Sequence, residues 1–270
     1  MNLIRVQDLS FSYGDNQMIL QGLNLEFTEQ TTAIIGQNGA GKTTFVKLLK
    51  GLLTPSSGDI FINNINTKEL TAAKLAKYIG LVFQNPNDQI FKSKVIDEVM
   101  FGPLNIGYSE KESKEYAIEA LELVGLSGEV DRNPYDLSLS QRKMITVASV
   151  LAMQTNIIIF DEPTMGQDYE GKEKLKEIMR RLHHNGKLVI SILHDMDFVA
   201  EVFERTIVFN RGRVLMDGDT RSVFSKVEML KGAYLDQPFV TQVGKQLGFA
   251  DTFLNVDELV EYAVSREIHN

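Results

Sequence analysis

The chain contains no cysteine at any of its 270 positions. Disulfides, thiolate metal ligands and a cysteine nucleophile are therefore excluded. No apolar run approaches the roughly 20 residues that a membrane-spanning helix needs. The N-terminal stretch MNLIRVQDLS carries Arg5 and Asp8 among its apolar residues and does not have the pattern of a signal peptide. We expect a soluble, cytoplasmic protein that depends on other subunits if it acts at a membrane.

Positive charge is also scarce. The 28 basic residues are outnumbered by 36 acidic ones, which gives a net charge of −8. A protein whose whole surface grips nucleic acid is usually basic, so we expect no nucleic-acid partner. Hydrophobic residues make up 43% and charged residues 24%, close to the values of globular proteins, so a disordered chain is excluded. At roughly 150 residues per domain, the length suggests one large domain or two modest ones.

The first third of the chain has the periodicity of β-strands. Apolar and polar residues alternate with a period of two, or short apolar runs occur, at residues 9–13, 23–27, 31–36, 58–63 and 78–83. A helix is expected from Lys42 to Leu52, where Thr54-Pro55 stops it. The middle third, from about Asp88 to Met153, is helical instead. Its position inside a strand-bearing chain suggests an inserted subdomain.

Two helices of this middle block can be placed more closely. Ala117, Ala120, Leu121 and Val124 share one helix face that Gly125 can end. A second helix is expected from about Gln141 to Met153.

Strand patterns return in the last third. Apolar runs at 157–160 and 188–193, with a helix between them, indicate buried parallel strands, and residues 207–216 read as a hairpin. In the tail, Pro238 suits the first turn of a helix, and Asn255 with Glu258 resembles a capping box for another. Two such short amphipathic helices must dock on the main domain or on a partner.

A phosphate-binding loop is the most specific motif. Residues 36–43 read GQNGAGKT and fit G-x-x-x-x-G-K-[ST], for which roughly 0.01 chance matches are expected in this length. Backbone N–H groups of such a loop converge on phosphate oxygens, and the helix that follows adds its positive N-terminus. Lys42 would reach the β- and γ-phosphates, and Thr43 would hold Mg²⁺.

Two acidic residues follow the buried run IIIF. Asp161 at this point can hold Mg²⁺ directly or through water, and Glu162 could act as general base on the attacking water. Two acids where a strand leaves a sheet are common, so the phosphate loop is what makes this interpretation specific.

Gln84 and His194 stand at corresponding places, each directly after an expected buried strand. Ligands of open α/β sheets bind at the carboxyl ends of the strands, so these groups converge if the strands are neighbours. Gln84 would then orient water and Mg²⁺, and His194 would contact the γ-phosphate. A lone Gln or His at a strand end is otherwise only a polar loop residue.

The combination resembles the ATP-binding cassette (ABC) ATPases over about Met1 to Ser222. This resemblance implies an α/β fold of the P-loop NTPase kind, with an ABC-type mixed-sheet core, an antiparallel β subdomain, a helical signature subdomain and a small helical C-terminal extension. It also implies ATP and Mg²⁺ as cofactors. Tyr13 matches the aromatic residue that stacks on adenine, although it also shares a strand face with Leu9 and Phe11.

The resemblance implies a full set of site residues. The expected catalytic residues are Lys42, Gln84, Glu162 and His194, and the expected metal ligands are Thr43, Gln84 and Asp161. The expected nucleotide contacts are Tyr13, Gly36, Gln37, Asn38, Gly39, Ala40, Gly41, Lys42, Thr43 and Thr44.

The family signature, usually LSGGQ, departs from its pattern in this chain. Ser138 and Gln141 match, but Leu139 and Ser140 stand where the family has glycines. In the family this segment binds the γ-phosphate that the opposite subunit holds. A bulky side chain where backbone N–H groups approach an anion predicts that this segment binds the γ-phosphate more weakly. The alternative is that the two substitutions have no effect on function. Asp168 matches the family's aspartate that crosses to the partner subunit.

One subgroup is matched more closely. FQNPNDQ at residues 83–89 resembles the segment after the Q-loop in energy-coupling factor (ECF, cobalt/vitamin type) transporter ATPases, and the tail with NVDELVEYAV looks like their C-terminal extension. The implied organisation is an ABC ATPase domain at 1–232, with a helical subdomain inserted at about 88–153. An extension at 233–270 would follow and contact the partner subunit.

The same resemblance implies partners and a place in the cell. Two related ATPases pair in this group, and the altered signature favours a heterodimer with a paralog. An integral membrane scaffold subunit would dock near Phe83–Phe91, where Phe83, Ile90 and Phe91 are expected to be exposed. The scaffold carries a separate substrate-binding membrane subunit. The chain would sit peripherally at the cytoplasmic face of the cell membrane and power uptake of a vitamin or metal-ion micronutrient.

Two other functions remain open at this level. One is a soluble ABC ATPase acting on nucleic acid or ribosomes; such proteins usually carry two cassettes, long helical insertions or basic arms, whereas this chain has one phosphate loop and a compact insertion. The other is an inert regulatory paralog that only binds ATP, against which Glu162 and His194 argue.

Overall fold

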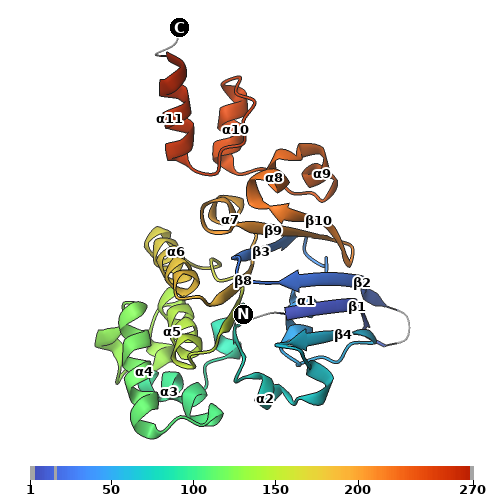
Figure 1. Cartoon of the computed structure of the whole chain (residues 1–270). Helices are drawn as coiled ribbons and strands as arrows, with labels where there is room; N and C mark the ends of the chain where they lie inside the picture. Colours follow the sequence, from blue (N-terminus) through green and yellow to red (C-terminus); the bar gives the residue numbers. More distant parts are fainter. Residues whose placement is uncertain (1–3, 15–16, 268–270) are drawn as a thin grey trace.

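A computed structural model of the chain describes residues 4–14 and 17–267. Two β-sheets lie at its centre, a helical block flanks them at one side, and two C-terminal helices project from the opposite end (Figure 1). The outer limits of the expected domains, residues 1 and 270, fall outside the described residues. In the part of the chain that the structure describes, no helix is both long and apolar enough to cross a bilayer.

The larger sheet has six strands in the order β10-β9-β3-β8-β7-β6. Its strands are β3 (Thr32–Gly36), β6 (Ile79–Val82), β7 (Ile157–Asp161), β8 (Leu188–Ile192), β9 (Arg205–Asn210) and β10 (Arg213–Asp219). Strand β10 pairs antiparallel with β9 as the expected hairpin, and all other pairings are parallel. The carboxyl ends of β3, β8, β7 and β6 therefore lie side by side at one edge.

The smaller sheet is antiparallel, with the order β2-β1-β4-β5. Its strands are β1 (Ile4–Ser12), β2 (Met18–Phe27), β4 (Ser57–Ile62) and β5 (Ile65–Asn66). Its apolar residues pack with helix α1 (Lys42–Leu49) against one face of the six-stranded sheet, where Ile34, Phe45 and Ile159 share a core. The alternation of apolar and polar residues in the sequence places the apolar side chains of the antiparallel sheet on the side that packs against the larger sheet.

The opposite face of the larger sheet is covered by helices α5 (Leu139–Ala152) and α6 (Tyr169–His184). Helices α3 (Val95–Ile106) and α4 (Glu110–Leu123) pack on α5, and α7 (Met196–Val202) packs on α6. A single cluster of buried residues runs from Ala117 on α4 through Val147 on α5 to Phe160 on β7. The helical block at about 88–153 therefore shares its core with the sheet. The predicted α/β class, with a mixed sheet, an antiparallel sheet, a helical block and a helical extension, is confirmed.

Two helix boundaries differ from the sequence prediction because local capping decides them. Helix α1 ends at Leu49 and not at Leu52, because Gly51 adopts a φ of +71° and Leu52 N donates back to Lys47 O. Helix α5 begins at Leu139 and not near Gln141, because Ser138 and Gln141 form a reciprocal capping box. The pattern S-x-x-Q at 138–141 was the signal that could have placed this start.

The remaining elements are short. Helix α2 spans Ala72–Leu75, α8 spans Thr220–Ser225 and α9 spans Val227–Gly232. Single 3₁₀ turns occur at Thr67–Glu69, Pro86–Asp88, Ser127–Glu129 and Pro134–Asp136.

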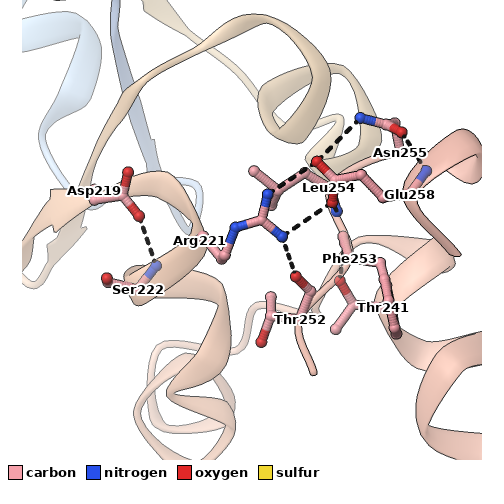
Figure 2. A network of polar contacts seen from close by, with 9 residues as sticks. All are labelled: Asp219, Arg221, Ser222, Thr241, Thr252, Phe253, Leu254, Asn255 and Glu258. Carbon is pink, nitrogen blue, oxygen red and sulfur yellow. Dashed lines mark hydrogen bonds and ion pairs between the residues drawn. The ribbon is translucent and has the colours of Figure 1, made fainter. Parts of the chain in front are cut away.

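The C-terminal extension carries α10 (Phe239–Gln246) and α11 (Val256–Glu267), with a small core of Val240, Phe253 and Leu259. Figure 2 shows how it is attached: Arg221 on α8 makes two 2.9 Å bonds to the Glu258 carboxylate and a further bond to Thr252 O. The hydrogen bond from Arg221 holds the pKa of the Glu258 carboxyl below its usual value. Of the two places expected for these helices, the main domain or a partner, the structure shows contacts with the main domain.

Only one of the two hydrogen bonds of the expected capping box forms at Asn255. Glu258 N donates to Asn255 Oδ1 at 2.9 Å, whereas the Glu258 carboxylate accepts from Leu254 N at 3.0 Å (Figure 2). Arg221 draws the carboxylate toward the main domain, which explains the change of partner.

Candidate functional site

The site lies where four parallel strands end. A cavity of about 370 Å³ opens over the loop after β3. Its lining residues are Ile19, Asn38, Gly39, Ala40, Gly41, Lys42, Thr43, Thr44, Gln84 and Glu162. The loop, Gln84 after β6 and Glu162 after β7 thus come together from strands far apart in the sequence, because β6 and β7 are neighbours.

The loop 36–43 is shaped around two of its glycines. A Cβ at Gly36 would lie 2.3 Å from Phe209 O, and one at Gly41, where φ is +98°, would lie 2.5 Å from Leu20 Cδ2. Side chains are therefore excluded at both positions by packing as well as by backbone conformation. The glycines of the motif are required by β9 and β2, not only by a ligand.

Lys42 is buried at the base of this loop, with 5% of its surface exposed. Its Nζ donates to Gly36 O at 2.6 Å and to Gln37 O at 3.0 Å. Burial lowers the pKa of Lys42, and the carboxylates of Glu162 and Asp161 oppose that shift. The ammonium is thus held beside the loop by carbonyl groups, where an anion could attract it more strongly than those neutral acceptors do.

Glu162 is the centre of a three-residue contact. Its Oε2 accepts from Gln84 Nε2 at 2.9 Å, and its Oε1 lies 3.1 Å from His194 Nε2. Its backbone has a φ of +48°, a left-handed conformation that is costly for a residue with a side chain. Such strain concentrates at functional sites because the surrounding fold must impose it.

Asp161 offers a buried oxygen for a cation. Its Oδ1 is buried without a hydrogen-bond partner, and Thr43 bonds to its side chain. Burial first, and then the charge of Glu162, raises the pKa of Asp161 to about 6. A cation at this point would relieve both effects, so Asp161 and Thr43 fit Mg²⁺. Within residues 4–14 and 17–267, no group of three or more His, Asp or Glu side chains is placed to hold a metal ion.

Tyr13 lies outside the lining of the cavity. Its ring is 48% exposed and meets Phe11 edge-on, with the ring centroids 4.8 Å apart. Ile19 on β2 lines the cavity instead, and sequence reasoning missed it. Its place beside Leu20, whose side chain faces Gly41, was not readable without the pairing of the two segments.

The signature segment borders a different hollow, of about 920 Å³, which shares no residue with the loop cavity. Its lining includes Ser138, Ser140, Gln141 and Asp168. Ser138 and Gln141 cap α5 as described, and Asp168 caps α6 by accepting from Gly171 N at 2.8 Å. One chain alone therefore does not bring LSLSQ to its own phosphate loop.

Leu139 and Ser140, the two residues that stand where the signature pattern has glycines, both lie against residues 166–167 of the same chain. Ser140 Oγ donates to Gln167 Oε1 at 3.0 Å, and Gln167 Nε2 returns a 3.4 Å bond to Ser140 O. Leu139 leans toward Gly166, where an added Cβ would lie 3.2 Å from Leu139 Cδ2. Sequence reasoning missed Gln167, because nothing local indicates a bond across 27 positions.

Of the three apolar residues expected to be exposed in Phe83–Phe91, the prediction is wrong for Ile90, partly right for Phe83 and right for Phe91. Ile90 is buried at 3% exposure and Phe83 packs partly against the core, while Phe91 is 56% exposed. Glu98 holds the backbone here by accepting from Phe91 N and Lys92 N. The Pro turn directs Ile90 inward, so the apolar surface lies one residue further on.

Phe91 belongs to an exposed apolar patch with two residues of α3. Its ring meets Phe101 at a centroid distance of 4.7 Å, and Leu104 is 43% exposed nearby along the helix. Phe91, Phe101 and Leu104 are called the α3 patch below.

Comparisons with known proteins agree with this geometry. Residues 20–165 match the family model described as ABC transporter. A protein of Pyrococcus furiosus, provisionally named an ABC transporter ATP-binding protein, is 39% identical over 259 residues, covering 96% of this chain and 98% of its own length.

A second relative and a solved structure point to a narrower group. The energy-coupling factor transporter ATP-binding protein EcfA2 of Caldanaerobacter subterraneus is 37% identical over 253 residues, covering 90% and 88% of the two chains. CbiO1 of Clostridium perfringens, described as part of the ABC transporter complex cbiONQ, superimposes with a TM-score of 0.76 at 31% identity. It covers 91% of this chain and 98% of its own.

Proposed function

The chain belongs to the ABC transporter family, and we propose that it is the ATP-binding and ATP-hydrolysing subunit of an energy-coupling factor transporter. In this role it would power uptake of a vitamin or metal-ion micronutrient. The observation that carries the proposal is the contact of Gln84 and His194 with Glu162 at the rim of the phosphate loop. An ATP-binding protein without hydrolysis would not need this strained, doubly bonded carboxylate.

The chain's own groups divide the reaction among them. Lys42 neutralises charge on the transferred phosphoryl group, and the loop N–H groups hold the remaining phosphate oxygens. Glu162 orients and deprotonates the attacking water. Gln84 and His194 hold the two carboxylate oxygens of Glu162 in place. Thr43, Asp161 and Gln84 would hold Mg²⁺, which supplies positive charge that stabilises the transition state.

The assembly we propose has two ATPase subunits facing head to tail. LSLSQ of this chain then serves the nucleotide on the partner, because the structure leaves it outside its own loop cavity. The missing glycines favour a paralog as partner, with an intact signature that completes this chain's site. The extension at 233–270 would add to the contact, since Val256, Val260 and Val264 on α11 are at least half exposed.

On the membrane side of the assembly, a scaffold subunit would bind to the α3 patch. This scaffold would in turn carry the substrate-binding subunit. The chain itself would be peripheral, at the cytoplasmic face of the cell membrane. We expect the chain to co-purify with integral membrane proteins after detergent extraction, and ATPase activity to accompany the complex. Recovery of nucleic acid or ribosomes instead of membrane proteins would favour the alternative function, a soluble ABC ATPase.

Phe101→Glu should weaken binding of the scaffold subunit by about 30-fold and reduce uptake, while ATP binding stays unchanged. The reason is that the change removes an aromatic anchor, and such anchors commonly contribute ~2 kcal/mol or more. It also places a carboxylate in the contact, beside Lys92, whose Nζ lies 5.0 Å from the centre of the Phe101 ring. Detergent pull-down measures assembly, and binding of a fluorescent ATP analogue measures the nucleotide site.

Ile118→Glu is a matched control for this change. Ile118 lies on α4 in the same helical block and is 46% exposed, close to the 38% of Phe101. Normal assembly of Phe101→Glu, or equal loss in both variants, would place the scaffold elsewhere. Ile90→Glu is unsuitable because Ile90 is buried and the change would destabilise the fold.

A further inference from the structure

Lys143 on α5 is a buried cation that the proposed chemistry does not use. Only 1% of its surface is exposed, and its Nζ donates to Phe83 O and Gln84 O, each at 2.7 Å. Burial lowers the pKa of Lys143 to about 8, and the carboxylates of Asp161 and Glu162 partly oppose the shift. Burying an ammonium group costs free energy unless the group is well hydrogen-bonded. The bonds to the two carbonyl groups offset that cost, and in return they fix the backbone at these two residues.

The two carbonyls lie where the chain leaves the edge of the sheet. Strand β6 ends at Val82, and Phe83 N is bonded to Gln89 Oε1 at 3.0 Å, which closes the turn that follows. Gln84 then sends its side chain to Glu162. Lys143 therefore fixes the backbone from which the amide of Gln84 reaches the proposed general base.

The same helix holds the far end of this turn as well. Arg142 Nη1 donates to Asn87 Oδ1 at 2.8 Å, and Gln89 Nε2 donates to Thr146 O at 3.3 Å. The first turn of α5 is the signature segment. One helix thus connects the surface expected to meet the partner's nucleotide, the turn at residues 83–89 that leads to Phe91 of the α3 patch, and the residue that contacts Glu162.

We propose that Lys143 is a positioning residue that clamps Gln84 to the signature helix, so that α5, Gln84 and the turn at residues 83–89 move as one body when the subunit pair closes on nucleotide. The inference rests on the proposed function. It adds a route by which closure of the subunit pair moves Gln84 and thereby changes its contact with Glu162. The charge-assisted bonds to two consecutive carbonyls make the link stiff.

The test uses the purified transporter complex and measures kcat, KM for ATP and the thermal midpoint. Lys143→Met keeps the length of the side chain but donates no hydrogen bond, and we expect kcat to fall about tenfold while KM changes less than about twofold. Lys143→Arg retains the donors and should recover most of kcat. In a Gln84→Ala background, Lys143→Met should add less than about twofold, because the clamp then has nothing to position.

Lys50 supplies a matched control. Its Nζ donates to Ile79 O at the other end of β6, and burial lowers its pKa to about 8 as well. Lys50→Met should lower the thermal midpoint about as much as Lys143→Met and leave kcat within about twofold of wild type.

Three results would each overturn the clamp alone: wild-type kcat in Lys143→Met, an undiminished tenfold loss in the Gln84→Ala background, or the same loss of kcat in Lys50→Met. A wild-type complex without ATPase activity would instead overturn the proposed function, and the clamp with it.

Discussion

Lys42→Ala is expected to abolish ATP hydrolysis at the site of this chain, with a loss of at least about 10²-fold. Lys42 is the cation that the structure buries against the phosphate loop, where low polarity strengthens its attraction to phosphate. Steady-state ATPase of the purified complex measures the effect, with the partner's own site inactivated so that only this site can turn over.

Lys47→Ala is the control for that change. Lys47 lies on the same helix, α1, but is exposed and is not among the residues that line the loop cavity. Its replacement should leave turnover unchanged. Wild-type turnover in Lys42→Ala would show that the loop does not hold the transferred phosphate.

Glu162→Gln should stop most turnover while ATP binding is kept. The substitution preserves the shape of the side chain and its reach toward Gln84 and His194, but it removes the negative charge that accepts a proton from water. General-base catalysis contributes about 10²- to 10⁴-fold, so the loss should be plain in single-turnover measurements. Glu110→Gln, at an exposed acid in the first turn of α4, should have no such effect.

The matching change in the paralog should cost less, because its nucleotide meets LSLSQ and we expect that site to contribute little turnover. Equal losses from the two mutants leave two explanations: LSLSQ is functional, or the two sites fire only together. Glycines at 139 and 140 then distinguish them. Leu139→Gly with Ser140→Gly should raise activity only if the signature is weakened, although it also removes the bonds to Gln167.

Much of the nucleotide site was readable from the sequence because its chemistry is local. The loop 36–43 needs glycines, a lysine and a threonine at fixed spacing, and Asp161 and Glu162 follow directly on a buried strand. Period-two alternation predicted the strands, and Gly125 marked the end of α4 where the structure has it. These features depend on residues within one turn or one strand, which is why a single sequence contains them.

The tertiary structure alone decided how these pieces meet. Gln84 contacts Glu162 across 78 positions because β6 and β7 happen to be neighbours, and no local pattern encodes that order. The inward turn of Ile90, the exposure of the α3 patch and the bond between Ser140 and Gln167 depend in the same way on packing between distant elements. Lys143 is the clearest case: a lysine beside a signature reads as a surface residue, and only the closure of α5 over the edge of β6 buries its charge against two carbonyl groups.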